Sequence, residues 1–396
     1  MADPALIFND PANRAGTHVL LIGVGDYPWL EAGAKCTTPA RQAAAMGMGQ
    51  LGAPPLSMRA MADWFLDQFA NPDKPLASVA LLLSEPVATD YRGSAVPRGS
   101  IADVKKAVGA WITRANTRRD NALIFAFCGH GMSAGQNSVL LCRDVARNDQ
   151  NFYEGAIDFE NFRIALSTRM PDTQLLLIDA CRTRDLEAVV YGQKTPGDAL
   201  IGAVSTMPRD NTQAMQCVQY ATSPDTVAWG PDNGTSLFTR ALLDSLAGGG
   251  ADRTQQWWVT TTELQAALAT YLPRLARQWD VQQVPGNQSL PFRICKPEKI
   301  VVPLYVRSTE PSIWDETVTI RATRGTDFSE EIAHDPLAVP GRSECEFRLH
   351  NPSLKPRDVT YDVFARFGPG SVFLDAEDVA HAYPPEAVCE LSVSRR

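Results

Sequence analysis

Short, continuously apolar runs recur along residues 1–296, separated by amphipathic stretches of helical spacing. An apolar run without polar alternation is typical of a strand that is covered by helices on both faces of its sheet. Such runs lie at 18–27, 78–84, 121–131, 173–184 and 215–223. The pattern therefore predicts a central sheet with both faces buried.

The stretches between these runs predict helices. Ser57 is the expected N-cap of a helix whose apolar stripe continues to Phe69, and Ser100 with Asp103 has the spacing of a capping box. Pro273 is expected to kink the last helix. The remaining helices are expected at 158–170, 238–246 and 262–279.

Alternation of strand and helix at this interval predicts parallel strands joined by right-handed crossovers. The expected fold class is α/β, a helix-sheet-helix sandwich with a mostly parallel central sheet in a first domain, residues 1–296. Residues 297–396 change to short strands, several of them alternating polar and apolar positions. They predict a second domain, a β-sandwich that binds a partner or braces the first. Its strands are expected at 299–307, 316–323, 345–351, 358–367 and 388–394.

Composition places the chain among soluble globular proteins, with 44% hydrophobic and 21% charged residues in 396. A net charge of −8 argues against nucleic acid or an anionic membrane as the main partner. No leader segment and no apolar stretch of about 18 residues is evident, so we expect a cytoplasmic protein. Eight cysteines without a C-x-x-C pair indicate neither a disulfide framework nor a zinc site, and no metal ligands are predicted.

Two reactive side chains follow two of the apolar runs directly. His130, followed by Gly131, ends the run at 121–131, and Cys181 follows the run that begins at 173. Open parallel sheets bind ligands beyond the carboxyl ends of their strands, so imidazole and thiol are expected to share a cleft. The imidazole should lower the effective pKa of the thiol and accept its proton, as in cysteine hydrolases. Residues 31–55 lack periodicity and predict a mobile loop beside this cleft.

The other cysteines carry no comparable context. Buried cysteine is common as a small apolar side chain, and we assign these residues to packing. They are Cys36, Cys128, Cys142, Cys217, Cys295, Cys345 and Cys389.

The spacing of His130-Gly131 and the segment Asp179 to Arg182 resembles the signature of the caspase and metacaspase superfamily. The resemblance covers roughly residues 17–296. It implies a cysteine endopeptidase of the prokaryotic or metacaspase type, acting on proteins or peptides through His130 and Cys181. It also implies an oxyanion site made by the backbone N–H groups of Gly131 and Cys181.

Strand geometry places Asp179 on the same face as Cys181, and Cys128 on the same face as His130. By resemblance, an acid at position 179 indicates cleavage after Arg or Lys, and a planar guanidinium favours Arg over Lys. The family's second pocket acid is replaced by Ser57, for which helix capping is the simpler role. An alternative for Asp179 is to cap nearby backbone or to hold an internal arginine such as Arg182.

Further substrate-binding candidates are Ser223 and Asp225, which lie where the family's next strand lines the substrate groove. The unpatterned stretch 182–214 predicts a long functional loop. By resemblance to caspase maturation, we expect it to be cut by the enzyme itself, by an upstream protease, or under control of a regulatory protein. Its basic residues are Arg182, Arg184, Lys194 and Arg209.

Two other functions remain open. A catalytically silent caspase-fold scaffold would act by protein binding through the C-terminal β domain, but it has no chemical reason to keep both His130 and Cys181. A redox or metal site built from Cys128, His130 and Cys181 lacks a fourth ligand at the expected spacing. No cofactor is predicted, although the resemblance implies that many metacaspases need calcium and that many prokaryotic relatives serve in cell death or defence.

Overall fold

The structure is a computed structural model of the chain. It describes residues 3–37, 47–87, 89–134, 137–182, 197–202, 214–223, 226–288, 290–326, 328–338, 340–341, 343–351 and 359–396. Most of the loop expected to be cut after Cys181, including Arg184, Lys194 and Arg209, lies outside the described residues.

The chain divides into two compact units. The first comprises residues 1–243 and 268–296, and the second comprises 244–267 and 297–396. Residues 244–267 therefore group with the C-terminal part of the chain, whereas the sequence pattern assigned them to the first domain. The reason is local packing: the backbone of Gly248 lies against Ile300 and Val301, so closely that a Cβ would come within 2.7 Å of the Val301 nitrogen.

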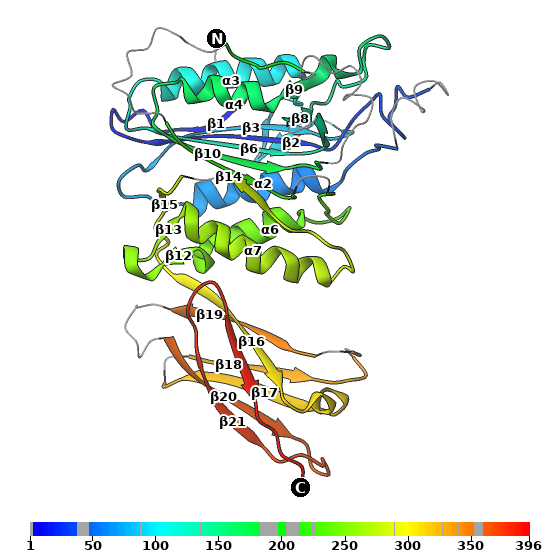
Figure 1. Cartoon of the computed structure of the whole chain (residues 1–396), viewed down its shortest axis with the longest axis vertical. Helices are drawn as coiled ribbons and strands as arrows, with labels where there is room; N and C mark the ends of the chain where they lie inside the picture. Colours follow the sequence, from blue (N-terminus) through cyan, green and yellow to red (C-terminus); the bar gives the residue numbers. More distant parts are fainter. Residues whose placement is uncertain are drawn as a thin grey trace. The chain divides into compact units, whose positions relative to one another are not determined.

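The first unit is built on a seven-stranded sheet with the order β1-β3-β2-β6-β10-β11-β14 (Figure 1). Its inner strands β3, β2, β6, β10 and β11 run parallel, and β1 and β14 close the two edges in the antiparallel direction. Their bounds are β1 Leu6–Asn9, β2 Thr17–Val24, β3 Leu76–Ser84, β6 Ala122–Cys128, β10 Thr173–Asp179, β11 Met215–Tyr220 and β14 Gly286–Gln288. Every residue of β2, β6 and β10 is buried, as their continuous apolar runs predict.

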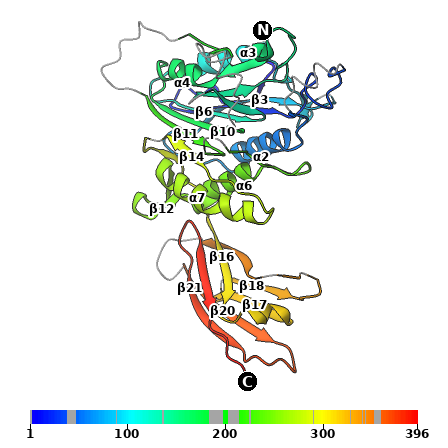
Figure 2. The same ribbon diagram turned by 45° about the vertical axis from the view of Figure 1, so that its right-hand side comes forward.

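Helices cover both faces of this sheet, α3 and α4 on one and α2 on the other (Figures 1 and 2). The helices are α2 Ala53–Asp67, α3 Ile101–Ala115, α4 Phe159–Ser167, α6 Leu237–Asp244 and α7 Thr261–Arg277. The helix-sheet-helix architecture expected from the sequence is thus present. Shorter elements are β4 Asp90–Tyr91, β5 Ser94–Ala95, β7 Gly131–Ala134, β8 Asn137–Leu141, β9 Ala156–Asp158, β12 Ala251–Asp252, β13 Trp258–Thr260 and β15 Arg293–Cys295.

Helix ends agree with the sequence at some positions and not at others. The capping box of Ser100 and Asp103 is present at the start of α3. Ser57, by contrast, is not an N-cap, because α2 already begins at Ala53 with two prolines in its first turn. Proline has no N–H to satisfy there and is preorganised for the first turn, so α2 begins without a Ser or Thr cap. Helix α7 runs through Pro273 as a single helix.

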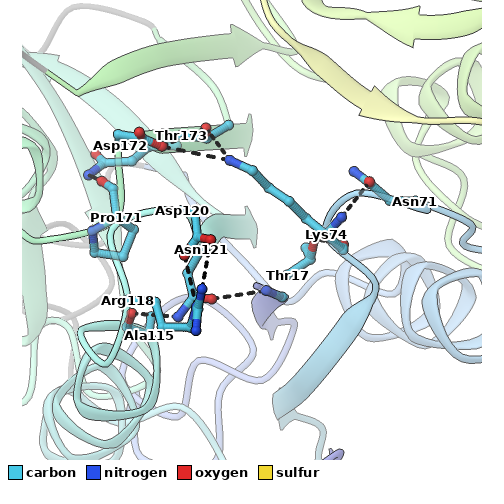
Figure 3. Close-up of polar contacts among 12 residues, drawn as sticks. Thr17, Asn71, Lys74, Ala115, Arg118, Asp120, Asn121, Pro171, Asp172 and Thr173 are labelled. Carbon is cyan, nitrogen blue, oxygen red and sulfur yellow. Dashed lines mark hydrogen bonds and ion pairs between the residues drawn. The ribbon is translucent and has the colours of Figure 1, made fainter. Parts of the chain in front are cut away.

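The amino-terminal ends of the parallel strands are joined by a buried polar cluster, shown in Figure 3. The amide of Asn121 accepts the Gly16 N–H at 2.9 Å and donates to the Ala115 carbonyl at 2.8 Å. Lys74 Nζ reaches Thr173 Oγ1 at 2.8 Å, and the Lys74 carbonyl accepts the Thr17 hydroxyl. This edge fixes the relative heights of β2, β6 and β10, and so the heights of their opposite ends.

In the second unit, residues 297–396 form two sheets, each with one buried face, in addition to the β12–β13 pair of residues 244–267. One has the order β19-β16-β22 and the other β18-β17-β20-β21. All five expected strands are found, but β18 and β21 were missed because their exposed positions are charged and their apolar alternation is weak. The strands are β16 Ile300–Ser308, β17 Val318–Arg324, β18 Phe328–His334, β19 Cys345–Asn351, β20 Thr360–Phe367, β21 Ala376–His381 and β22 Ala387–Leu391. Across the described residues of both units, no helix has the length and apolar character needed to span a bilayer.

Candidate active site

The carboxyl ends of β6 and β10 carry the two reactive side chains. These strands pair in parallel with Cys128 opposite Asp179, and the Gly129 N–H donates to the Asp179 carbonyl at 3.1 Å. His130 and Cys181 each stand two residues beyond that pair, so both segments leave the sheet at the same point. Both side chains are half-buried, in contrast to the seven other cysteines, all of which are buried.

Gly131 lies where the two segments touch. A Cβ added to it would come within 2.8 Å of the Ala180 Cβ and 2.9 Å of the Cys181 carbonyl oxygen, closer than folded proteins tolerate. Glycine is required here for the approach of two backbones. The Cys181 N–H contacts only its own sulfur among the described residues, so it can donate to a substrate oxyanion.

The ring of His130 is held by a backbone carbonyl. Its Nε2 lies 2.8 Å from the Gly49 oxygen, and no hydrogen bond joins the ring to the Cys181 thiol within the described residues. Because a carbonyl only accepts, Nε2 must carry the hydrogen of the neutral ring. The Nδ1 lone pair is thereby left to accept a proton, and Nδ1 is the nitrogen that can act as a base.

Both reactive groups are neutral at rest. Burial raises the pKa of the Cys181 thiol above its usual value, and a backbone hydrogen bond from Ala228 opposes this only in part. Sγ also lies 3.7 Å from the Ala228 carbonyl oxygen, to which the thiol can donate. Burial also lowers the pKa of His130, against the hydrogen bond to Gly49. The expectation that the imidazole lowers the thiol pKa is therefore not met in this structure, because desolvation opposes the charged form of each group.

Asp179 is buried beside Cys181 in a cluster of polar side chains, the Asp179 pocket. Its Oδ2 accepts hydrogen bonds from the hydroxyls of Ser236 and Thr239, the latter at 3.2 Å, and from the Cys128 thiol at 3.4 Å. Within the described residues, no hydrogen bond reaches Oδ1. Burial raises the pKa of Asp179 from 3.8 to about 6 despite these donors.

Ser57 belongs to the same pocket. It is fully buried in α2, where its Oγ accepts the Ser236 N–H at 2.9 Å, and its hydroxyl also bonds with Cys128. Ser57, which stands where the family has a second acid in its pocket, thus contributes a neutral hydroxyl. Asp179 remains the carboxylate of the pocket.

Arg182 does not pair with Asp179. Its buried guanidinium lies 4.2 Å from the centre of the Tyr220 ring, and its backbone N–H donates to the Thr226 carbonyl at 3.1 Å. Asp179 caps no backbone group among the described residues either, so the alternatives expected for this carboxylate are not found.

Ser223 follows β11 at the same edge of the sheet, with its N–H and hydroxyl directed to the Val284 carbonyl. It makes no contact with the Asp179 pocket through these bonds. Asp225 lies outside the described residues. Sequence reasoning missed Gly49, Ser236 and Thr239; only Ser236 had a local signal, since its Oγ accepts the Thr239 N–H at 3.0 Å as an N-cap does.

An apolar strip also escaped the sequence analysis. Val227 and Val284 are more than half exposed and Trp279 is 48% exposed, while Trp229 contacts Trp279 with tilted rings whose centroids lie 4.8 Å apart. Trp229 directly follows Ala228, whose carbonyl contacts the Cys181 thiol. The described part of the chain holds no group of three or more His, Cys, Asp or Glu side chains arranged to bind a metal ion, so the metal hypothesis gains no support there.

The protonation state gives a prediction. Alkylation of Cys181 by iodoacetamide should accelerate only as the pH rises past the usual thiol value of 9.0, because the raised pKa keeps the thiolate scarce at neutral pH. The measurement is the rate of Cys181 labelling against pH, by mass spectrometry, with Cys181→Ser as the blank. A plateau already reached at pH 6 to 7 would show an ion pair instead.

Comparisons with known proteins bear on the family of the chain. The family model of the peptidase C14 caspase domain matches residues 90–293, just over half of the 396 residues. The uncharacterized protein y4kE of Sinorhizobium fredii is 27% identical over 304 residues, covering 67% of this chain and 86% of that protein. Among solved structures, caspase-1 of Spodoptera frugiperda is similar with a TM-score of 0.41 and 13% identity, covering 71% of this chain and 94% of that one. The protein GSU0716 of Geobacter sulfurreducens is similar with a TM-score of 0.40 and 13% identity, covering 70% and 94%. On the match to more than half of its length, the chain belongs to the caspase-domain family, whose fold is that of cysteine peptidases.

Proposed function

We propose that the protein is a cysteine endopeptidase that cleaves proteins or peptides after a basic residue, through His130 and Cys181. The observation that carries the proposal is the paired end of β6 and β10, from which an imidazole, a thiol and a buried carboxylate leave the sheet together. Apolar side chains of a peptide substrate would pack against the apolar strip near Cys181, and a cationic side chain would pair with Asp179.

The chemistry follows from the resting protonation. As Sγ attacks the carbonyl carbon of the scissile peptide bond, the thiol proton passes to Nδ1 of His130. The N–H groups of Gly131 and Cys181 would stabilise the oxyanion. His130 then returns the proton to the departing amine, the C–N bond breaks, and water hydrolyses the thioester to free Cys181. These groups suffice for the reaction, and the proposal includes no cofactor.

Asp179 would select the residue before the scissile bond. Its Oδ1 has no donor among the described residues, and a buried carboxylate is costly without a cationic partner. A guanidinium can donate to it through a fork of N–H groups, so Arg should be preferred over Lys. Ser236, Thr239 and Cys128 hold Oδ2 and fix the direction of the carboxylate.

Replacing either member of the dyad tests the reaction itself. Cys181→Ala and His130→Ala should each lower kcat by at least about 10³-fold, because the nucleophile or its base is lost, while melting temperature stays near that of the wild type. The measurement is turnover of a fluorogenic peptide with arginine before the scissile bond. Cys295→Ala and His381→Ala are the matched controls and should retain turnover.

The same experiment distinguishes the peptidase from the alternative, a catalytically silent scaffold. A folded wild type that neither turns over peptides nor reacts with a peptidyl fluoromethyl ketone at Cys181 would contradict the peptidase. The C-terminal β domain would then be the working part of the molecule, as the alternative requires.

Asp179→Asn tests the selectivity. In the variant, the preference for an Arg peptide over a Leu peptide should fall by on the order of 100-fold, because a neutral amide does not offset the free-energy cost of desolvating a guanidinium. In the wild type the preference should grow as the pH rises through about 6, where Asp179 ionises. Matched peptides differing only at that residue, assayed from pH 5 to 8, give the ratio; equal ratios in both proteins would exclude Asp179 from the pocket.

The same substitution should stabilise the fold. A carboxyl whose folded pKa is raised from 3.8 to about 6 contributes stability below pH 4 that is lost as the pH rises through 6. Asn stays neutral, so above pH 7 the variant should be more stable than the wild type by up to about 3 kcal/mol, and by little at pH 4. Denaturant unfolding at the two pH values measures this. A variant that is destabilised equally at both would show that Asp179 is buried for structure and not for substrate.

Maturation by cleavage between Arg182 and Arg209 is part of the same proposal, by the enzyme itself or by an upstream protease. Chain termini of the wild type and of Cys181→Ala, mapped by mass spectrometry after incubation, should differ if the enzyme cuts itself. Full turnover by an uncut chain would remove cleavage from the proposal.

A further inference from the structure

Tyr27 contacts His130 at its backbone and at its ring. The fully buried Tyr27 hydroxyl accepts the His130 N–H at 2.8 Å and donates to the Leu141 carbonyl at 3.2 Å. The Leu141 N–H in turn donates to the His130 carbonyl at 3.0 Å. Both backbone groups of His130 are therefore tied to one residue of β8, one of them through the tyrosine hydroxyl. The two rings also touch, with centroids 4.8 Å apart.

Gln50 ties the other side of His130 to the same tyrosine. Its Oε1 accepts the Tyr27 N–H at 2.8 Å, and its Nε2 donates to the carbonyls of Tyr27 and Glu31 at 3.0 and 2.9 Å. Gly49, the preceding residue, offers its carbonyl to Nε2 of His130. The position of that carbonyl is thus set by the amide pair between Gln50 and Tyr27.

A buried tyrosine that served only as core would need one partner for its hydroxyl, and phenylalanine would fill the same space. Here the hydroxyl is both acceptor and donor. One partner is His130 itself, and the other belongs to β8, the strand that pairs with β7 directly after His130. Tyr27 contacts the N–H and the ring face of His130 directly. It also acts on Nε2 of His130 indirectly, because Gln50 links it to the Gly49 carbonyl.

We propose that Tyr27 and Gln50 are positioning residues that hold His130 with Nδ1 directed to the reacting thiol. The inference rests on the proposed peptidase function. A shift of the imidazole by about 1 Å can cost on the order of 100-fold in rate without altering how substrate binds.

Tyr27→Phe and Gln50→Met test this. Each should lower kcat, and the rate constant for inactivation of Cys181 by a peptidyl acyloxymethyl ketone, by about 10- to 100-fold. The KM and the inhibitor binding constant should stay within about twofold, because neither residue belongs to the Asp179 pocket. A role confined to stability would instead lower the fraction of protein that can be labelled and leave the rate of that fraction unchanged.

Tyr91→Phe is the matched control, since it removes the hydroxyl of another buried tyrosine, a hydroxyl that donates to Asp63 at 2.7 Å. It should leave kcat unchanged at a similar loss in melting temperature. Wild-type rates in Tyr27→Phe, or equal losses in Tyr27→Phe and Tyr91→Phe, would overturn the inference while leaving the peptidase intact. A wild type without turnover that depends on Cys181 and His130 would overturn both.

Discussion

The register between β6 and β10 is the constraint on which the site depends. Parallel pairing of Cys128 with Asp179 sets the height at which the two strands end, and the two reactive residues follow that pair at equal spacing. A slip by one residue would turn every side chain of one strand to the other face, so the histidine and the thiol could no longer meet. The polar cluster around Asn121 and Lys74 fixes this register from the opposite end of the sheet.

Desolvation explains the protonation states of the site residues in the absence of substrate. The same burial raises the pKa values of Cys181 and Asp179 and lowers that of His130, so it suppresses charge on each of the three groups. Cys181 and His130 are thereby held neutral near pH 7, whereas Asp179 ionises as the pH rises through about 6. Burying these ionisable groups costs free energy that an apolar core would not cost, as is common at functional sites.

Sequence patterns were sufficient for much of the architecture and for part of the site. Continuous apolar runs located the central strands, and the strand ends located His130, Gly131, Cys181 and Asp179, because these features are local. The hydroxyls around Asp179 and the supports of His130 come from α2, α6 and the loop before α2, and no local pattern links these segments to the strand ends. Ser57 illustrates the difference, since its residue type fitted a helix cap and only the fold revealed its contacts with Cys128 and Ser236.

The place of β2 in the sheet bears on which part of the chain can fold alone. The caspase-domain match begins at residue 90, yet β2 lies between β3 and β6 inside the sheet, and both β2 and β3 end before residue 90. A fragment limited to residues 90–293 would expose one whole edge of β6 and lose Tyr27, Gly49 and Gln50 as well. The independent folding unit is therefore larger than the recognisable family segment, and the amino-terminal residues are as much a part of the enzyme's core as the strands that bear the reactive groups.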